Sequence, residues 1–267
     1  TVTGYKVISN DAPASDLTQV TAQTVKATDD SQTYTVVYVL NYTRTMKTIN
    51  QTINYVDQQG TTVAPSHQAT PVRFLTVYTP VYGSTATKVI YYSTTATSME
   101  VDNNGVPTES AWIRGDQTTF AAVTNPTVLG YKVISNDAPA SNLTEVTAQN
   151  VKAADRDQTY TVVYAPDYAV TQTKTINQTI HYVDNHNQPM PGLNSHTATP
   201  VTFLTVTNPV DGATTTYYST TATDLNLDND GVPTGTDWTE GDATTFAAVA
   251  NPEVDHYKVI SNDANAD

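Results

Sequence analysis

The stretch Tyr131-Lys132-Val133-Ile134-Ser135-Asn136-Asp137-Ala138 occurs three times in this chain. Its copies begin at Tyr5, Tyr131 and Tyr257, a constant spacing of 126 residues. A period of that length is the size of a whole small domain and is too long for a coiled-coil or solenoid repeat. The sequence therefore predicts domain-sized repeats in tandem.

A second string, Gln32-Thr33-Tyr34-Thr35-Val36-Val37-Tyr38, recurs at residues 158–164. Its tyrosines alternate with threonine and valine at period two, which is typical of a strand with one inner face. The string that begins at Tyr131 alternates in the same way. Only together can the two strings bury a two-sided core, so we expect the Tyr131 string and residues 159–164 to be neighbouring strands of one sheet.

The strings divide the chain into three parts. Residues 43–168 make up a complete repeat, residues 1–42 resemble the closing part of a preceding repeat, and residues 169–267 form a second repeat that lacks its last strand. We expect the chain to be a piece of a longer array, with open strands at both ends that can pair between molecules. The alternative is a shifted frame in which the Tyr131 string starts a domain, so that both ends are complete.

Composition favours a β-sheet protein with a polar surface. The chain has 17 Tyr, 38% hydrophobic residues and a net charge of −14. This charge repels phosphate backbones and anionic lipids, which argues against nucleic-acid binding. Cysteine is absent, so there is no disulfide framework. No run of 18 apolar residues occurs, and we expect no membrane insertion.

One segment leaves the type of element open. Asp116 could cap the start of a short helix that ends at Pro126. The threonine and valine content of the segment between them suits a strand equally well. We therefore expect a mainly β fold with at most one short helix per repeat.

The order of parts in this chain resembles the mucus-binding repeats (Mub or MucBP type) of lactobacillus cell-surface adhesins. The residues that carry the resemblance are Thr52-Ile53-Asn54-Tyr55-Val56-Asp57, Gly60, Thr62-Val63-Ala64, Pro71-Val72-Arg73-Phe74, Phe120-Ala121-Ala122-Val123-Thr124-Asn125-Pro126, Gly130-Tyr131 and Tyr160-Thr161-Val162-Val163-Tyr164. No single motif among them is specific, whereas the ordered set is. It covers nearly all of residues 43–168.

The resemblance implies a β-grasp-like module of ββαββ order. It also implies an extracellular location on a Gram-positive cell, in a parent protein anchored to the cell wall. The implied partners are mucin glycoproteins or their glycans, and immunoglobulins for some relatives. No nucleophile elbow, zinc-protease motif or phosphate-binding loop occurs in the sequence, so we expect a protein without enzymatic activity.

A calcium site is one hypothesis for the second repeat. Oxygen-bearing side chains follow the spacing of a calcium loop, with glycine at position 6. The candidate ligands are Asn226, Asp228, Asp230 and Asp237. Position 12 holds Asp in place of a bidentate Glu and no helix flanks the loop, so an ordinary polar turn is the alternative reading.

Two pairs of adjacent tyrosines are the candidate ligand-binding residues. They are Tyr91, Tyr92, Tyr217 and Tyr218. Neighbouring strand residues point to opposite faces, so one ring of each pair is expected inside and the other outside. An exposed ring beside threonine hydroxyls can stack on a sugar, or it can pack on a neighbouring loop.

These observations together predict adhesin repeats that bind mucin glycoproteins or host glycans weakly and multivalently. The alternative is a stalk of spacer repeats that projects a distal binding domain from the cell wall.

Overall fold

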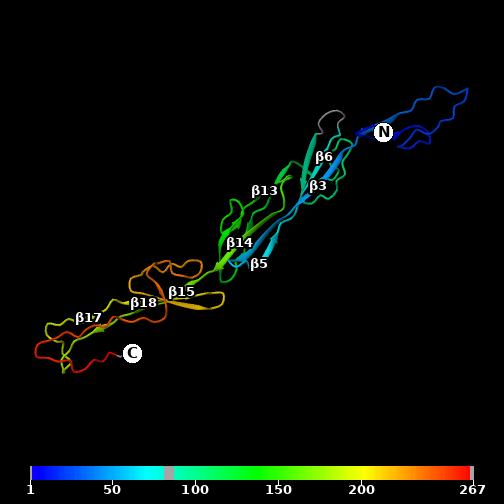
Figure 1. The fold of residues 1–267 in the computed structure, drawn as a ribbon. Coiled ribbons are helices and arrows are strands. Elements are labelled where there is room, and N and C mark those ends of the chain that lie inside the picture. The colour runs from blue at the N-terminus through cyan, green and yellow to red at the C-terminus, as the bar shows by residue number, and fades with distance from the viewer. Residues whose placement is uncertain (1, 81–86, 265–267) are drawn as a thin grey trace. The chain divides into compact units, whose positions relative to one another are not determined.

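The computed structural model describes residues 2–80 and 87–264, and every regular element within them is a β-strand (Figure 1). The expected mainly β fold is confirmed. The chain divides into two compact units. One comprises Thr1–Pro126 with Val133–Tyr164, and the other Thr127–Lys132 with Ala165–Asp267. No helix within the described part of the chain is long and apolar enough to cross a membrane.

The segment between Asp116 and Pro126 forms two short strands and no helix. Threonine and valine lose side-chain freedom in a helix, and here each short strand finds an antiparallel partner. The pairs are β9 (Gln117–Phe120) with β13 (Gln149–Lys152), and β10 (Val123–Thr124) with β12 (Glu145–Val146). The helix of the ββαββ order is therefore wrong for this repeat, and the β-grasp detail stays a prediction.

The first sheet of the complete repeat, here the β6 sheet, is antiparallel throughout. Its strands in spatial order are β3 (Thr43–Ile49), β6 (Val72–Tyr78), β7 (Lys88–Ser93) and β8 (Ile113–Arg114). Continuous registers join its three long strands, from Thr43↔Tyr78 to Ile49↔Val72 and from Arg73↔Ser93 to Tyr78↔Lys88. Figure 1 shows β3 and β6 side by side.

Both faces of the β6 sheet are covered, because its strands carry apolar residues at successive positions. One face holds the buried cluster Ile49, Val72, Phe74, Phe120 and Val151, the last two supplied by the β9–β13 pair. The other face holds the buried cluster Leu75, Val77, Tyr91, Ala96 and Trp112. The core of this repeat therefore lies on both faces of the β6 sheet.

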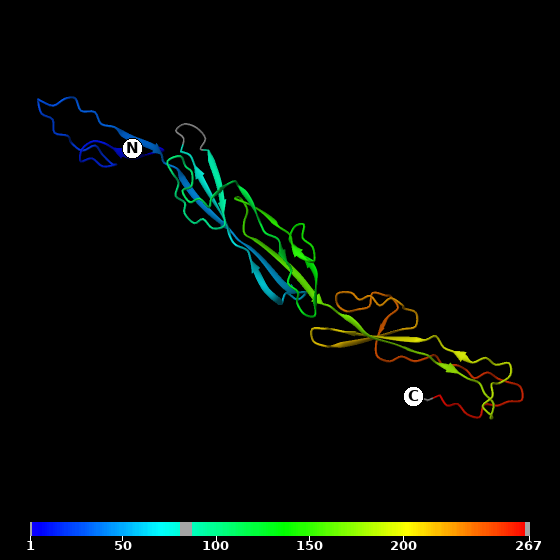
Figure 2. The same cartoon turned by 180° about the vertical axis from the view of Figure 1, so that it is seen from behind.

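The second sheet, here the β14 sheet, contains a parallel central pair. Its strands in spatial order are β11 (Tyr131–Asn136), β14 (Gln158–Pro166), β4 (Gln51–Asp57) and β5 (Thr62–Gln68). The predicted neighbours β11 and β14 are confirmed. Strand β14 runs parallel to β4. Only Asn50 separates β3 from β4, so the chain passes straight from one sheet into the other (Figure 2).

Tyr164 closes the core of the β14 sheet. Its side chain is 1% exposed, its hydroxyl donates to the carbonyl of Pro126 at 2.7 Å, and its ring meets that of Tyr55 edge-on at 6.4 Å. Burial, with a smaller contribution from Tyr55, raises the pKa of Tyr164 to about 12. The ring is thus an integral part of the repeat's interior.

A polar cluster links the starts of β4 and β14. The carboxylate of Asp157 accepts the backbone N–H of Asn50 at 2.8 Å and its side-chain amide at 3.1 Å. The amide of Gln51 donates to Gln158 at 3.0 Å. The backbone bond to Asn50 contributes most to lowering the pKa of Asp157, its side-chain bond adds to this, and Lys47 contributes less.

The lowered pKa of Asp157 predicts acid sensitivity. A carboxyl group with a depressed folded-state pKa stabilises the fold above its ordinary value of 3.8, and this contribution is lost as the pH falls through the folded-state pKa. We expect Asp157→Asn to be less stable than the parent at neutral pH, with the difference shrinking as the pH falls below 3.8. Denaturant unfolding at neutral pH and at a series of pH values below 3.8 measures it, with Asp263→Asn, outside any strand, as the control. A difference independent of pH would contradict the assignment.

The first 42 residues carry the two repeated strings as a pair of strands. Strand β1 (Tyr5–Asn10) pairs antiparallel with β2 (Val36–Leu40). Tyr38, the sequence counterpart of Tyr164, is 44% exposed. The tyrosine of this string is therefore buried in β14, where β4 lies beside it, and exposed in β2. Within the described residues β2 has only β1 as a partner. The frame that begins at residue 43 stays our proposal.

The second copy repeats the β6 sheet. Its strands are β15 (Ala169–Ile176), β18 (Val201–Thr207), β19 (Thr214–Ser219) and β20 (Thr239–Glu240), here the β18 sheet. The place of the long β4–β5 hairpin is taken by β16 (Thr179–Ile180) and β17 (His196–Thr197). Residues 241–264 are described and contain no strand.

Candidate functional site

The tyrosine pair of the first repeat lies on β7, where the two side chains point to opposite faces. Tyr91 is 9% exposed and belongs to the cluster of Trp112. Tyr92 is half-buried, with its ring centroid 6.5 Å from that of Phe74. Of this pair, Tyr92 is the more exposed residue, although it packs against the cluster of Phe74.

The pair on β19 repeats this arrangement. Tyr217 is 7% exposed and packs with Leu204 and Val206. Burial raises the pKa of Tyr217, and the charge of Glu240 adds to this effect. Tyr218 is half-buried, and its ring centroid lies 6.1 Å from that of Phe203. Tyr92 and Tyr218 therefore occupy equivalent, partly accessible positions in the two copies.

Tyr42 and Tyr168 are two structural residues that the sequence analysis missed. A Cβ added to Gly105 would lie 2.5 Å from the Tyr42 ring, and one added to Gly231 would lie 2.5 Å from the Tyr168 ring. Each ring thus lies directly against the glycine of an acidic turn. The signal in the sequence is the common spacing of 126 residues that separates both the two tyrosines and the two glycines.

The residues of the calcium hypothesis lie in and beside one of these turns. The Asp228 carboxylate accepts the backbone N–H groups of Asp230 and Val232, both at 2.9 Å. Asn226 donates its amide to Asp224, and the Asp237 carboxylate accepts the hydroxyl of Thr221 at 3.1 Å. Across residues 2–80 and 87–264, no three His, Asp or Glu side chains converge as a metal site would require.

Asp228 belongs to a set of four turns with one design. In each, an aspartate carboxylate accepts the backbone N–H groups two and four residues later. The four aspartates are Asp57, Asp102, Asp184 and Asp228. These bonds lower the pKa of Asp102, with the Val106 N–H contributing most, and that of Asp184, with the Gln188 N–H contributing most.

The calcium ion stays a prediction. Ligands that meet only in the folded state turn binding free energy into stability. If Asn226, Asp228, Asp230 and Asp237 bind calcium, millimolar calcium raises the thermal midpoint above that in chelator, and Asp237→Ala abolishes the rise. Equal midpoints with calcium and with chelator would remove the idea.

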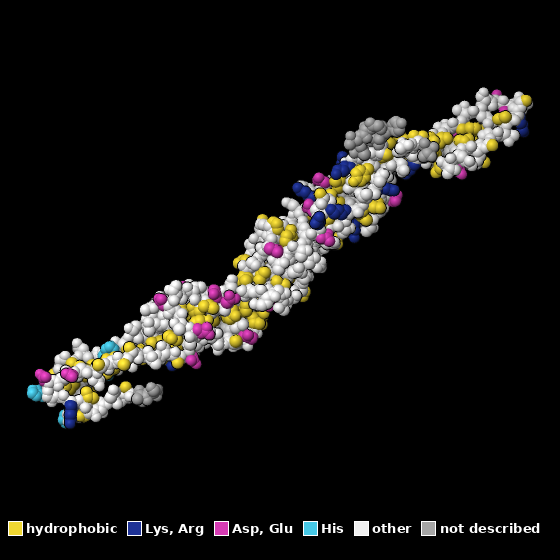
Figure 3. Space-filling model, viewed as in Figure 1, with side chains coloured by type: hydrophobic (Ala, Val, Ile, Leu, Met, Phe, Trp, Pro, Cys, Tyr) yellow, Lys and Arg dark blue, Asp and Glu magenta, His cyan; other side chains and the backbone are white. Residues whose placement is uncertain are grey.

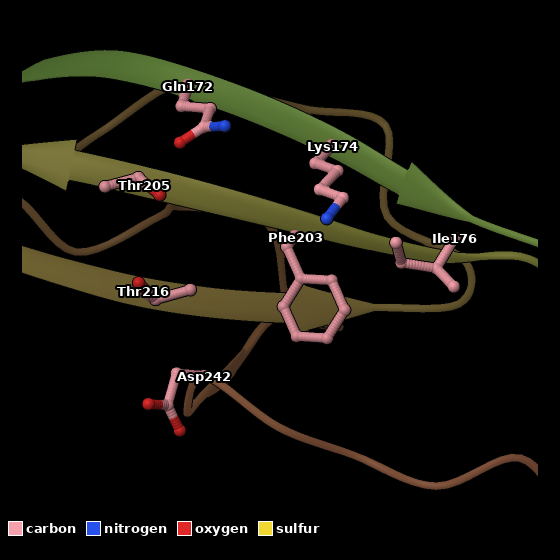
Figure 4. Close-up of a pocket in the computed structure, with 7 residues that line it drawn as sticks. All are labelled: Gln172, Lys174, Ile176, Phe203, Thr205, Thr216 and Asp242. Atoms are coloured by element: carbon pink, nitrogen blue, oxygen red, sulfur yellow. The ribbon is translucent and has the colours of Figure 1, made fainter.

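A hollow of about 340 Å³ lies on one face of the β18 sheet (Figure 4). Its lining residues are Gln172, Lys174, Ile176, Phe203, Thr205, Thr216 and Asp242. In the first copy the counterparts of Ile176 and Phe203 are fully buried beneath Phe120 and Val151. The hollow is therefore the place that the β9–β13 pair occupies in the first copy. Its residue types suit the packing of such a pair, so we do not assign a ligand to it.

The lysine in this hollow supports the same interpretation. Its counterpart in the first copy, Lys47, donates its ammonium group to the carbonyl of Ala153 at 3.2 Å and to that of Asp155. Both acceptors directly follow β13. Lys47 thus fastens the β9–β13 pair to the sheet, and Lys174 stands where it could do the same.

The β6 sheet and its second copy, the β18 sheet, differ in charge. Five of the 12 basic residues lie in residues 43–114, whereas residues 169–240 hold one, Lys174. Figure 3 shows dark blue side chains gathered over the first copy. The five are Arg44, Lys47, Arg73, Lys88 and Arg114. Only Arg44 among them has a described ion pair, with Glu100 at 3.2 Å. The two copies therefore present one fold with unlike electrostatic surfaces.

The comparison with protein families found a match for residues 40–168. This segment matches the model of the Muc B2-like domain. The match covers 129 of the chain's 267 residues, so this segment is similar to that domain. The sequence-based identification of a mucus-binding repeat is thereby confirmed. The matched segment includes both the β6 sheet and the β14 sheet.

Solved structures with mucus-related names show similarity to the chain. The match to the crystal structure of Mub-RV has 25% sequence identity and a TM-score of 0.30. It covers 61% of this chain and 76% of the Mub-RV chain. The mucin-binding domain of Spr1345 from Streptococcus pneumoniae is 21% identical, with coverages of 46% and 94% and a TM-score of 0.27. The type 2 repeat of the mucus binding protein MUB from Lactobacillus reuteri is 18% identical, with coverages of 61% and 76% and a TM-score of 0.25. None of these scores locates a binding site. Among curated proteins, none matches the chain.

Proposed function

We propose that the chain is a non-enzymatic part of a bacterial cell-surface adhesin, which binds mucin glycoproteins or their glycans through weak, repeated contacts. The observation that carries the proposal is the match of residues 40–168 to the Muc B2-like domain. The same match supports an extracellular location. Anchoring to a cell wall and immunoglobulin as a further partner belong to the proposal only through the resemblance to mucus-binding repeats.

Tyr92 and Tyr218 are the side chains to which we assign sugar contact. Each is half-buried, so its orientation is held by the sheet while part of its ring stays accessible. A ring fixed in this way loses little conformational entropy on binding, and its hydroxyl can bond to a sugar hydroxyl. Threonines lie on the same face of the sheet as Tyr218, for example the cross-strand pair Thr205 and Thr216, two residues along their strands from Phe203 and Tyr218.

Repetition is the second part of the proposal. A single aromatic contact is worth about 0.5–1.5 kcal/mol, which is far below what a stable complex needs. Two contacts on one tether raise the effective concentration of the second and so increase the overall strength of binding. Weak single sites are therefore sufficient if many of them engage the same mucin.

Binding of the full chain to purified mucin tests the proposal. With the chain immobilised at increasing surface density, we expect retention of mucin to rise more steeply than in proportion to density. Tyr92→Ala and Tyr218→Ala should each weaken binding by about threefold to tenfold, as expected for loss of one aromatic contact. The double variant should lose the density effect.

Tyr257→Ala is the matched control, because Tyr257 is 60% exposed and lies outside any strand. It should bind mucin as the parent does. Parent-like binding by the double tyrosine variant would remove the tyrosines from the proposal. No retention of mucin at any density would overturn the adhesin proposal and favour the alternative, a spacer. Immunoglobulin in place of mucin tests the further partner.

A further inference from the structure

Tension along the chain follows a short path through residues 43–166. It enters at the start of β3, and because only Asn50 interrupts the strands, it passes along the backbone directly into β4. It leaves through the end of β14. Residues 58–157 connect β4 to β14 and lie outside this path, so the load is transferred between the two strands themselves.

The two strands are arranged to share that load. Seven residue pairs join them in parallel and in continuous register, from Gln51↔Gln158 to Asp57↔Tyr164. In a parallel pair, the start of one strand and the end of the other lie at opposite ends of the ladder. Pulling on these two points slides the strands along each other, so the hydrogen bonds must break together. Pulling from the same end would break them one by one.

Both ends of this ladder are reinforced by side chains. At the start, Asp157 bonds to Asn50, and the backbone N–H of Gln158 donates to the Asn50 carbonyl at 2.9 Å. At the other end, the Tyr164 ring of β14 meets the Tyr55 ring of β4 edge-on at 6.4 Å. Between them, Ile53 and Val162 are fully buried, so water does not compete for the bonds in the middle of the ladder.

We propose that the β4–β14 pair is a shear clamp, which keeps residues 43–166 folded while tension acts along the chain. Load bearing is a function beyond mucin recognition and does not depend on it. The clamp sets the rate of forced unfolding, which is a kinetic property distinct from thermal stability.

Single-molecule pulling on the full chain tests the clamp. The chain has no cysteine, so two introduced cysteines are unique handles. Asn41→Cys with Asp167→Cys loads the pair in shear, whereas Asn41→Cys with Arg156→Cys loads it from one end. All three positions are exposed. We expect a several-fold higher unfolding force in shear, with a length gain of roughly 40 nm at the ~3.6 Å that each extended residue spans.

Two matched variants separate mechanical from thermal stability. Val162 in β14 and Val151 in β13 are both 0% exposed, but only Val162 lies on the load path. We expect Val162→Ala and Val151→Ala to lower the thermal midpoint alike, and only Val162→Ala to lower the shear force. Equal forces in the two pulling geometries would overturn the proposal. Equal loss of force in the two valine variants would also overturn it.

Discussion

Tyr164→Ala is expected to lower the free energy of unfolding by about 3–5 kcal/mol, as for other fully buried aromatic side chains. The substitution removes a ring that is 1% exposed and leaves a cavity beside Tyr55. It also removes the part-buried hydrogen bond that the hydroxyl donates to the Pro126 carbonyl. Urea unfolding followed by circular dichroism measures the loss.

Tyr38→Ala is the control for this prediction, because the same string surrounds both residues. Tyr38 is 44% exposed, so the same truncation should cost less than about 1 kcal/mol. The pair isolates burial from local sequence. A loss below about 1 kcal/mol for Tyr164→Ala would show that β14 is peripheral to the fold.

Gly105→Ala is expected to destabilise the first repeat by about 2–5 kcal/mol, the sum of backbone strain and overpacking. Gly105 has a φ of +77°, where a side chain is strained, and the new Cβ would lie 2.5 Å from the Tyr42 ring. The ring is part of the packing around Leu75 and Trp112, so it cannot move without opening that cluster. Thermal melting of the full chain measures the effect.

Gly60→Ala separates the two causes. Gly60 has a φ of +83° but nothing within 4 Å of the added Cβ, so only the strain of about 1–2 kcal/mol should remain. The double variant Gly105→Ala with Tyr42→Ala should lose less stability than the sum of the losses of the two single variants. Equal losses for Gly105→Ala and Gly60→Ala would show that the ring contact does not matter.

The sequence predicted that β11 and β14 are neighbours, but it did not predict that β14 also pairs with β4. The strings at Tyr131 and at residues 159–164 alternate regularly, and they were correctly paired as β11 and β14. The parallel contact of β14 with β4 joins residues 107 positions apart, such as Gln51 and Gln158, and no local pattern encodes such a partner. The strand β9 had equal support as a helix, because its antiparallel partner decides the outcome.

The candidate site shows the same limit. Alternation placed Tyr91 and Tyr92 on opposite faces, but it could not say what covers each face. In the structure Tyr91 packs with Trp112 and Tyr92 lies beside Phe74. Tyr92 is the more exposed of the two. The spacing around Asp228 matched a calcium loop, yet a turn that bonds its own backbone N–H groups has the same spacing of carboxylate and glycine.

The long separation of β4 from β14 has a consequence for how the domain is made. A chain that folds as it emerges forms the β4–β5 hairpin early, but β4 must wait for about a hundred more residues before its parallel partner exists. During that interval β2 is already present upstream on the same chain, and it shares the repeated string with β14. Strands with the same string in neighbouring repeats therefore compete to pair with β4. Exchange of strands between repeats is the characteristic misfolding route of such an array.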